Sequence, residues 1–256
     1  MSNKYLEVTN LKKSFGGIKA VDVESLNLNR NELTSIIGPN GAGKTTFFDL
    51  ISGFQDSDEG KVYLNNKNIS KSQPYAIARL GMIRTFQLTK VFDRLTFLEN
   101  MMFSASTVNN DSFLKSLAKL PSQKTTEKKI RDKSFEIMKE LNIDHMANSY
   151  AREMSGGQKK LLELGRSIIN NPSVLLLDEP LAGVNPKLAE EILQIILNLA
   201  GKGISILMVE HNIEAVMKIS ERVIVLAEGK VIADSTPENI RTDQKVIEAY
   251  LGSENE

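Results

Sequence analysis

The chain has 256 residues, which is enough for one large α/β domain or for a core with a smaller insert. Of these residues 41% are hydrophobic and 25% are charged, as in an ordinary globular protein. The 32 basic and 32 acidic residues cancel, so the basic excess that typifies a nucleic-acid-binding protein is absent, and no nucleic-acid partner is expected. The absence of cysteine excludes disulfides, thiol nucleophiles and cysteine-ligated zinc.

The first part of the chain carries strand signals on both sides of a glycine-rich loop. Asn31 stands in a turn, where its short side chain tolerates a positive φ. Residues 44–51 follow the loop and predict a helix. Short apolar or alternating stretches predict strands at residues 5–9, 18–23, 26–28, 33–37 and 61–64.

From about residue 89 the strand signals stop, and charged helical patterns replace them. Residues 127–141 show this best, since their apolar positions recur at helical spacing. His145 lies in this section without any neighbour of chemical interest, so we expect it on the surface. The section predicts a helical subdomain over about residues 89–160.

After this section, apolar strands and helices alternate again. Near-continuous apolar strands of this kind indicate a mostly parallel sheet that is buried on both faces. Glu228 and Gly229 predict a hairpin turn, and a helical tail ends near residue 252. The predicted strands are residues 173–177, 205–209, 222–227 and 230–234, and the predicted helices are residues 156–170, 186–200 and 213–219.

These patterns predict one domain with three parts. Its core is expected over about residues 1–88 and 161–235, with the helical subdomain between them and a tail over about residues 236–256. No stretch approaches the roughly 18 to 20 apolar residues of a membrane span, and the first residues lack the apolar run of a secretion signal. We therefore expect a cytoplasmic protein whose role at a membrane depends on a partner.

The glycine-rich loop at residues 38–45 satisfies the pattern G-x-x-x-x-G-K-[ST] between a predicted strand and a predicted helix. Glycines let the backbone curl so that several N–H groups face one anion, and the following helix directs its positive end at the same anion. Lys44 would contact the β- and γ-phosphates of ATP, and the Thr45 hydroxyl would ligate Mg²⁺. The expected nucleotide contacts are Gly38, Asn40, Gly41, Gly43, Lys44, Thr45 and Thr46.

Two acids, Asp178 and Glu179, follow the apolar strand at residues 173–177. Ligands of an open α/β sheet bind beyond the carboxyl ends of its strands. By itself, such a pair is commonly a helix cap or a solvated pair. Together with the phosphate loop, the pair is better explained by catalysis: Asp178 would hold Mg²⁺, and Glu179 would polarise a water molecule towards the γ-phosphate.

Between the loop and the acids lies the sequence Met-Ser-Gly-Gly-Gln at residues 154–158. The phosphate loop, this motif and the acidic strand, in that order, resemble the ATP-binding-cassette (ABC) ATPases over about residues 6–252. The resemblance implies an α/β P-loop NTPase fold: a RecA-like core, an N-terminal antiparallel β part and an inserted helical subdomain. It also implies a head-to-tail dimer, either a homodimer or a heterodimer with a paralogous ATPase. Each ATP would lie between the Lys44 loop of one subunit and Ser155, Gly156, Gly157 and Gln158 of the other.

The same resemblance assigns roles to three further residues. Phe15 would stack on the adenine, as an aromatic face suits a flat base. Gln87 would sense Mg²⁺ and link to the permease, and His211 would contact the γ-phosphate. Three other positions depart from the common pattern. Met154 replaces a leucine, Asn31 replaces a glycine, and Asn185 replaces an aspartate that hydrogen-bonds across the dimer.

Within the family, several segments are similar to the larger ATPase of branched-chain amino acid importers: residues 84–87, 95–100, 182–186 and 246–252. That resemblance implies transmembrane permease subunits as partners, a substrate-binding protein indirectly, and a peripheral position on the inner face of the membrane. Importers of urea and other amides belong to the same group, and the ATPase of an exporter or lipid-extraction system shares every catalytic motif. Two less favoured classes are soluble ABC ATPases of translation or repair and a nucleotide-gated module without turnover.

Overall fold

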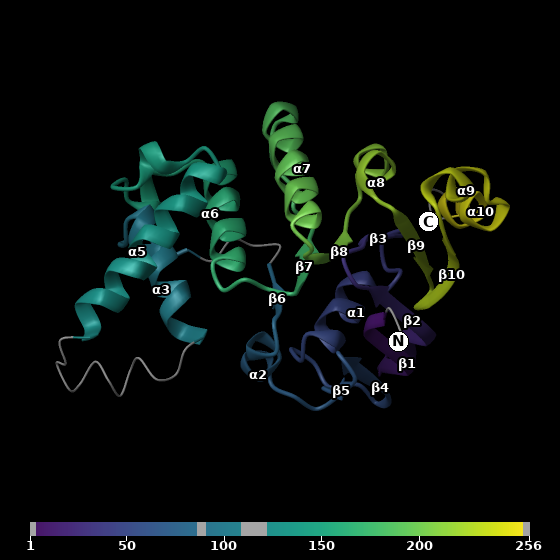
Figure 1. Cartoon of the computed structure of the whole chain (residues 1–256). Helices are drawn as coiled ribbons and strands as arrows, with labels where there is room; N and C mark the ends of the chain where they lie inside the picture. Colours follow the sequence, from purple (N-terminus) through teal and green to yellow (C-terminus); the bar gives the residue numbers. More distant parts are fainter. Residues whose placement is uncertain (1–3, 86–90, 109–121, 253–256) are drawn as a thin grey trace. The chain divides into compact units, whose positions relative to one another are not determined.

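A computed structural model describes residues 4–85, 91–108 and 122–252 of the chain. These residues form two compact units (Figure 1). The first contains residues 1–84, 173–181 and 196–256, and the second contains residues 85–172 and 182–195. Gln87 lies outside the described residues. No helix in the described ranges is both long enough and apolar enough to cross a membrane.

The first unit contains two sheets, whose strands Figure 1 labels. The smaller sheet is antiparallel and has the strand order β2-β1-β4-β5. Its strands are β1 (Lys4–Phe15), β2 (Ile18–Asn29), β4 (Glu59–Leu64) and β5 (Lys67–Asn68). The antiparallel N-terminal part is therefore as predicted, although the three short strands expected at its start are two strands of twelve residues.

The larger sheet has the order β10-β9-β3-β8-β7-β6, and only β10 is antiparallel to its neighbour. This confirms the mostly parallel sheet. Its central strands are buried along their whole length, which explains their unbroken apolar sequences. The strands are β3 (Leu33–Ile37), β6 (Met82–Arg84), β7 (Val174–Asp178), β8 (Ser205–Val209), β9 (Arg222–Ala227) and β10 (Lys230–Ser235).

Helix α1 (Lys44–Ile51) lies between the two sheets, since it contacts both β2 and β7. Phe47 and Phe48 are completely buried in one apolar cluster with side chains from both sheets. These two buried side chains therefore anchor the start of α1, and with it the phosphate loop, to the core. The other helices of this unit are α2 (Pro74–Arg79), α8 (Ile213–Ile219), α9 (Pro237–Thr242) and α10 (Gln244–Gly252).

The second unit is helical. Helix α3 (Phe97–Val108) packs on α5 (Ser122–Glu140) and on α6 (Gly156–Ile168). His145 is exposed in the short turn η1 (Asp144–Met146), as expected. Helix α7 (Pro186–Gly201) begins in this unit and ends in the first. The unit includes α6, whereas the sequence-based division assigns residues from 161 onward to the core.

Candidate functional site

The loop at residues 38–45 joins β3 to α1 in the strand–loop–helix arrangement that the motif requires. Two of its glycines are required by packing within the chain. A Cβ atom on Gly38 would lie 2.0 Å from the carbonyl oxygen of Leu226, and one on Gly43 would lie 2.1 Å from that of Ala20.

The outer part of the loop is exposed at Asn40, Gly41 and Thr45, and Thr46 is partly buried in α1. The curled loop therefore presents its apex to solvent.

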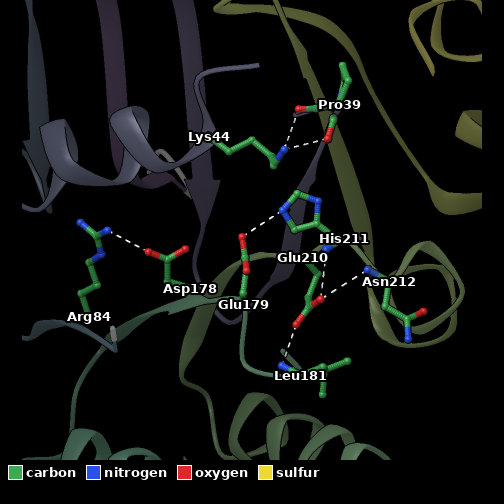
Figure 2. A network of polar contacts seen from close by, with 10 residues as sticks. Pro39, Lys44, Arg84, Asp178, Glu179, Leu181, Glu210, His211 and Asn212 are labelled. Atoms are coloured by element: carbon green, nitrogen blue, oxygen red, sulfur yellow. Dashed lines mark hydrogen bonds and ion pairs between the residues drawn. The ribbon is translucent and has the colours of Figure 1, made fainter. Parts of the chain in front are cut away.

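Lys44 is the first residue of α1, and its side chain folds back along the loop. Its Nζ donates hydrogen bonds to the carbonyl oxygens of Gly38 at 2.7 Å and Pro39 at 2.8 Å (Figure 2). Burial lowers the pKa of Lys44 from its ordinary value, and the negative charge of Glu179 opposes that shift. The ammonium group of Lys44 is thus held inside the loop. The carboxylate of Glu179 lies near enough to affect the pKa of Lys44.

Strand β7 ends at Asp178, and Glu179 follows it with a left-handed backbone, at a φ of 48°. Among the described non-glycine residues with positive φ, six are asparagines, which tolerate this region. The other two are Glu179 and Glu228, and Glu228 stands in the β9–β10 hairpin turn, where positive φ is ordinary. Glu179, by contrast, is not in a hairpin: it lies in a bend between β7 and the turn at residues 180–183. Outliers of this kind cluster at functional sites.

The unusual backbone directs the Glu179 side chain at His211. Atom Oε1 of Glu179 lies 2.9 Å from Nε2 of His211, as Figure 2 shows. His211 comes from the turn between β8 and α8, and β8 neighbours β7 in the sheet. The structure thus brings together two predicted catalytic residues that are 32 positions apart in the sequence.

Asp178 pairs with Arg84, a residue that no catalytic motif of the sequence includes. Arg84, at the end of β6, donates from Nη2 to Oδ2 of Asp178 at 2.8 Å. It also donates from Nη1 to Asp49 at 2.6 Å and to Ser52 at 3.0 Å. The side chains of Arg84 and Asp178 are only 6% and 3% exposed. Arg84 therefore fixes the acid at the end of β7 against helix α1.

Two more residues near these groups were not singled out from the sequence. Glu210 directly follows β8, whereas Asp178 is the last residue of β7. In both cases an acid at the end of an apolar strand is the sequence signal that could have pointed to the residue. Tyr250 of α10 forms a hydrogen bond with the backbone of Gly38, and burial raises its pKa to about 12. No sequence pattern connects a C-terminal tyrosine to the phosphate loop.

The Ser-Gly-Gly-Gln motif lies at the start of α6 in the second unit. Ser155 is the N-cap: its hydroxyl accepts a 3.3 Å hydrogen bond from Gln158 N, and Ser155 N donates to Gln158 Oε1 at 2.8 Å. A Cβ atom on Gly156 would meet nothing within 4 Å, whereas one on Gly157 would meet the Leu188 side chain at 2.1 Å. Nothing in the described chain therefore requires a glycine at position 156.

Three further predicted positions have clear surroundings. Phe15 ends β1 with 46% of its surface exposed, and Lys13 Nζ lies 5.6 Å from the centre of its ring. Met154 is buried, as a leucine would be. The side chain of Asn185 accepts from Leu188 N at 3.0 Å, which is an N-cap contact for α7. An asparagine therefore caps this helix in the place of the commoner aspartate.

Comparison with known proteins gives matches along almost the whole chain. Residues 21–182 match the family model described as ABC transporter. Residues 230–256 match the model described as branched-chain amino acid ATP-binding cassette transporter. A probable branched-chain amino acid transport ATP-binding protein, LivG, of Archaeoglobus fulgidus is 38% identical over 98% of this chain and 97% of its own. A high-affinity branched-chain amino acid transport ATP-binding protein, BraF, of Pseudomonas aeruginosa is 37% identical, over 98% and 99%.

The fold is similar to that of solved ABC cassettes. The ADP conformation of an ATP-binding cassette of an ABC transporter has a TM-score of 0.84 and 36% identity, and the match covers 98% of this chain and all of the other. A dimeric cassette in a post-hydrolysis state, bound to ADP and phosphate, has a TM-score of 0.76 and 26% identity over 91% of this chain and 98% of its own.

Proposed function

Because this chain belongs to the ABC transporter family of ATP-binding cassettes, we propose that it is the ATP-hydrolysing subunit of an importer of branched-chain amino acids. The observation that carries the choice of cargo is the match of residues 230–256 to the branched-chain amino acid model, since the ATPase motifs themselves are common to all cargoes. The similarity of both named relatives over the whole chain supports it further.

We propose that the phosphate loop holds ATP through backbone N–H groups and Lys44. The exposed apex of the loop and the position of the Lys44 ammonium support this role. The N-terminal end of α1 adds its partial positive charge. Phe15 would stack on the adenine, and its exposed ring at the end of β1 is free of the core packing that a structural phenylalanine needs.

Glu179 is proposed to hold the attacking water, and His211 to hold Glu179 and contact the γ-phosphate. The 2.9 Å contact between the two side chains supports a joint role. The left-handed backbone of Glu179 supports it as well, because such strain costs on the order of 1–3 kcal/mol and persists where the surroundings enforce it. A carboxylate held in this way orients water for in-line attack.

A Mg²⁺ ion would be held by Thr45 and Asp178 together with the phosphates of ATP. Hydroxyl and carboxylate oxygens are the donors that Mg²⁺ prefers, and it commonly uses only one or two protein ligands beside phosphate. No cluster of three or more ionisable ligands exists among the described residues, and this binding mode requires none. The ion would supply charge stabilisation on the transferred phosphoryl group. Gln87 remains a proposed third contact.

We further propose that two cassettes close on ATP, with Ser155, Gly156, Gly157 and Gln158 of one facing the phosphate loop of the other. The open space around Gly156 supports this, because a close approach from outside the chain would explain a glycine there. The dimeric state of one solved relative supports dimerisation as such. Closing and reopening would drive permease subunits in the membrane, to whose inner face the cassette would bind, and a substrate-binding protein would deliver the cargo.

A capture experiment tests this proposal. Tagged Glu179→Gln protein is incubated with ATP and detergent-solubilised membranes of the source organism, and the captured proteins are identified by mass spectrometry. We expect two permease chains and a second, shorter ATPase. Glu228→Gln, the other glutamate with a left-handed backbone, is the matched control and should capture them less stably because it still hydrolyses ATP.

The cargo is identified by transport assays. Wild-type copies of the captured subunits are assembled in lipid vesicles for this purpose. ATP-dependent uptake of radiolabelled leucine, competed by valine and isoleucine but not by urea or acetamide, would support the proposal. Competition by urea or acetamide would move the cargo to the amide group. Extrusion of lipid, or recovery of ribosomes or repair proteins instead of permeases, would overturn the importer assignment.

A further inference from the structure

Glu210 is a buried carboxylate with no role in the chemistry described above. It follows the last residue of β8 and is 3% exposed. Glutamate is almost never buried to this extent unless it is paired, because moving a charge out of water is costly. Its surroundings must therefore supply strong hydrogen bonds.

Three backbone N–H groups supply them. Oε1 of Glu210 accepts from Leu181 N at 2.7 Å, and Oε2 accepts from His211 N at 3.0 Å and from Asn212 N at 3.4 Å. Figure 2 shows the carboxylate between the two loops that carry these donors. Hydrogen bonds to an ionised carboxylate are about twice as strong as neutral ones.

The two loops are those that hold the proposed reacting pair. Leu181 comes two residues after Glu179, and His211 directly follows Glu210. We infer that Glu210 is a positioning residue for ATP hydrolysis, which clamps the Glu179 loop to the His211 turn so that their side chains stay within contact. This inference rests on the proposed roles of Glu179 and His211.

The conformation of Glu179 gives the clamp a physical purpose. A left-handed glutamate relaxes unless its neighbours hold it. On the N-terminal side, the N–H of Glu179 itself donates to the carbonyl oxygen of Val209 at 2.9 Å, which ties the residue to the end of β8. After it, the bond from Leu181 to Glu210 ties the loop to the same strand end. Glu179 is thus fixed from both sides against the residues that carry His211.

Helix capping does not account for Glu210. The N-cap of α8 is Asn212, whose side chain accepts from Ala215 N at 3.0 Å. The bond to Leu181 spans 29 residues and lies outside that helix. A residue that only completed the turn before α8 would not need a hydrogen bond to Leu181.

The test is Glu210→Gln, which keeps the shape but turns an NH₂ group towards backbone donors. Glu221→Gln is the matched control, since Glu221 also accepts a backbone N–H, from Leu33 at 3.2 Å, but at the other end of the sheet. We expect kcat for ATP to fall roughly 10- to 100-fold in Glu210→Gln, while KM and the affinity for ATP stay within about twofold, as for a loss confined to the transition state. Glu221→Gln should keep the wild-type kcat.

A second measurement does not depend on turnover. The chain has only two histidines, so imidazole ¹H–¹⁵N spectra contain His211 and His145 alone. Glu210→Gln should shift the His211 signals and leave those of exposed His145 in place. Glu210→Asp, which keeps the charge but is one methylene shorter, serves if the glutamine variant does not fold, and should shift the same signals.

An unchanged kcat with unmoved His211 signals in a folded Glu210 variant would overturn the inference. So would a parallel loss of ATP affinity, which would indicate general damage to the site. If the wild-type chain itself failed to hydrolyse ATP, the proposed function would fail, and the imidazole spectra would still decide whether Glu210 orients His211.

Discussion

Oε1 of Glu179 and Nε2 of His211 lie 2.9 Å apart, although the two residues come from different strand ends. The contact depends on neighbouring strands β7 and β8, whose carboxyl ends lie side by side, and on a left-handed backbone at Glu179. A parallel sheet thus brings a carboxylate and an imidazole together at the edge where ligands of such sheets bind.

The pair predicts different results for the two histidines of the chain. His211→Ala should lower kcat for ATP on the order of 10²-fold, because Glu179 loses the partner that holds it. His145→Ala should leave kcat unchanged, since His145 is exposed in the helical unit. Steady-state phosphate release measures both, and equal rates for His211→Ala and wild type would contradict the role of His211.

Gly156 allows stability and function to be separated. Gly156→Ala should not destabilise the chain, because a Cβ there meets nothing within 4 Å. The same change, made in the Glu179→Gln variant that is expected not to hydrolyse ATP, should weaken ATP-driven dimerisation. Light scattering measures the dimer. Gly201→Ala, which also enters open space at the end of α7, is the control and should dimerise normally.

The buried pair of Arg84 and Asp178 predicts a large loss of stability. Arg84→Met leaves a buried carboxylate without its cation, which costs about 3 to 5 kcal/mol in measured cases. Urea unfolding should show the loss, and Arg84→Met combined with Asp178→Asn should recover part of it. Arg79→Met, at an exposed arginine over Tyr75, is the matched control. An unaltered unfolding midpoint in Arg84→Met would show that the pair contributes nothing.

The fold was predictable where sequence periodicity and punctuation agree. Strand β3 and helix α1 have the predicted bounds because an apolar run meets a glycine-rich loop abruptly. Asn31 has the predicted positive φ, of 56°. Strand β1 was predicted too short because it continues past Asn10, where a left-handed residue and a shift of register interrupt the alternation. Strand β6, with three residues, was too short to give a pattern.

The sequence predicts the candidate site as a list of residue types and not as a set of contacts. Motif spacing singles out Lys44, Asp178 and Glu179 as candidates, and the structure places each at or next to the end of a strand or the start of a helix. The partners Arg84 and Glu210 depend on strand order: β6 pairs with β7, and β7 with β8. Arg84 and Asp178 are 94 residues apart, and no local pattern encodes that separation.

Phe15 can be tested by fluorescence because the chain contains no tryptophan. Phe15→Trp should retain ATP binding, and its emission should change when the adenine stacks on it. Phe15→Ala should weaken ATP binding by roughly 1 to 3 kcal/mol, the usual value for one stacked base. Tyr75→Trp, exposed on α2, is the control, and ATP should leave its emission unaltered. Equal ATP affinity in Phe15→Ala and wild type would contradict stacking.

The catalytic role of Glu179 is tested most sharply by one turnover of γ-³²P-labelled ATP. Wild-type, Glu179→Gln and Glu228→Gln protein are compared, with ATP binding and molecular mass measured on the same samples. Loss of the Glu179 carboxylate should slow cleavage by roughly 10²- to 10⁴-fold. Glu179→Gln should bind ATP with wild-type affinity, persist as a dimer and release almost no phosphate, while Glu228→Gln should behave as wild type. Near-normal phosphate release by Glu179→Gln would contradict the catalytic role of Glu179.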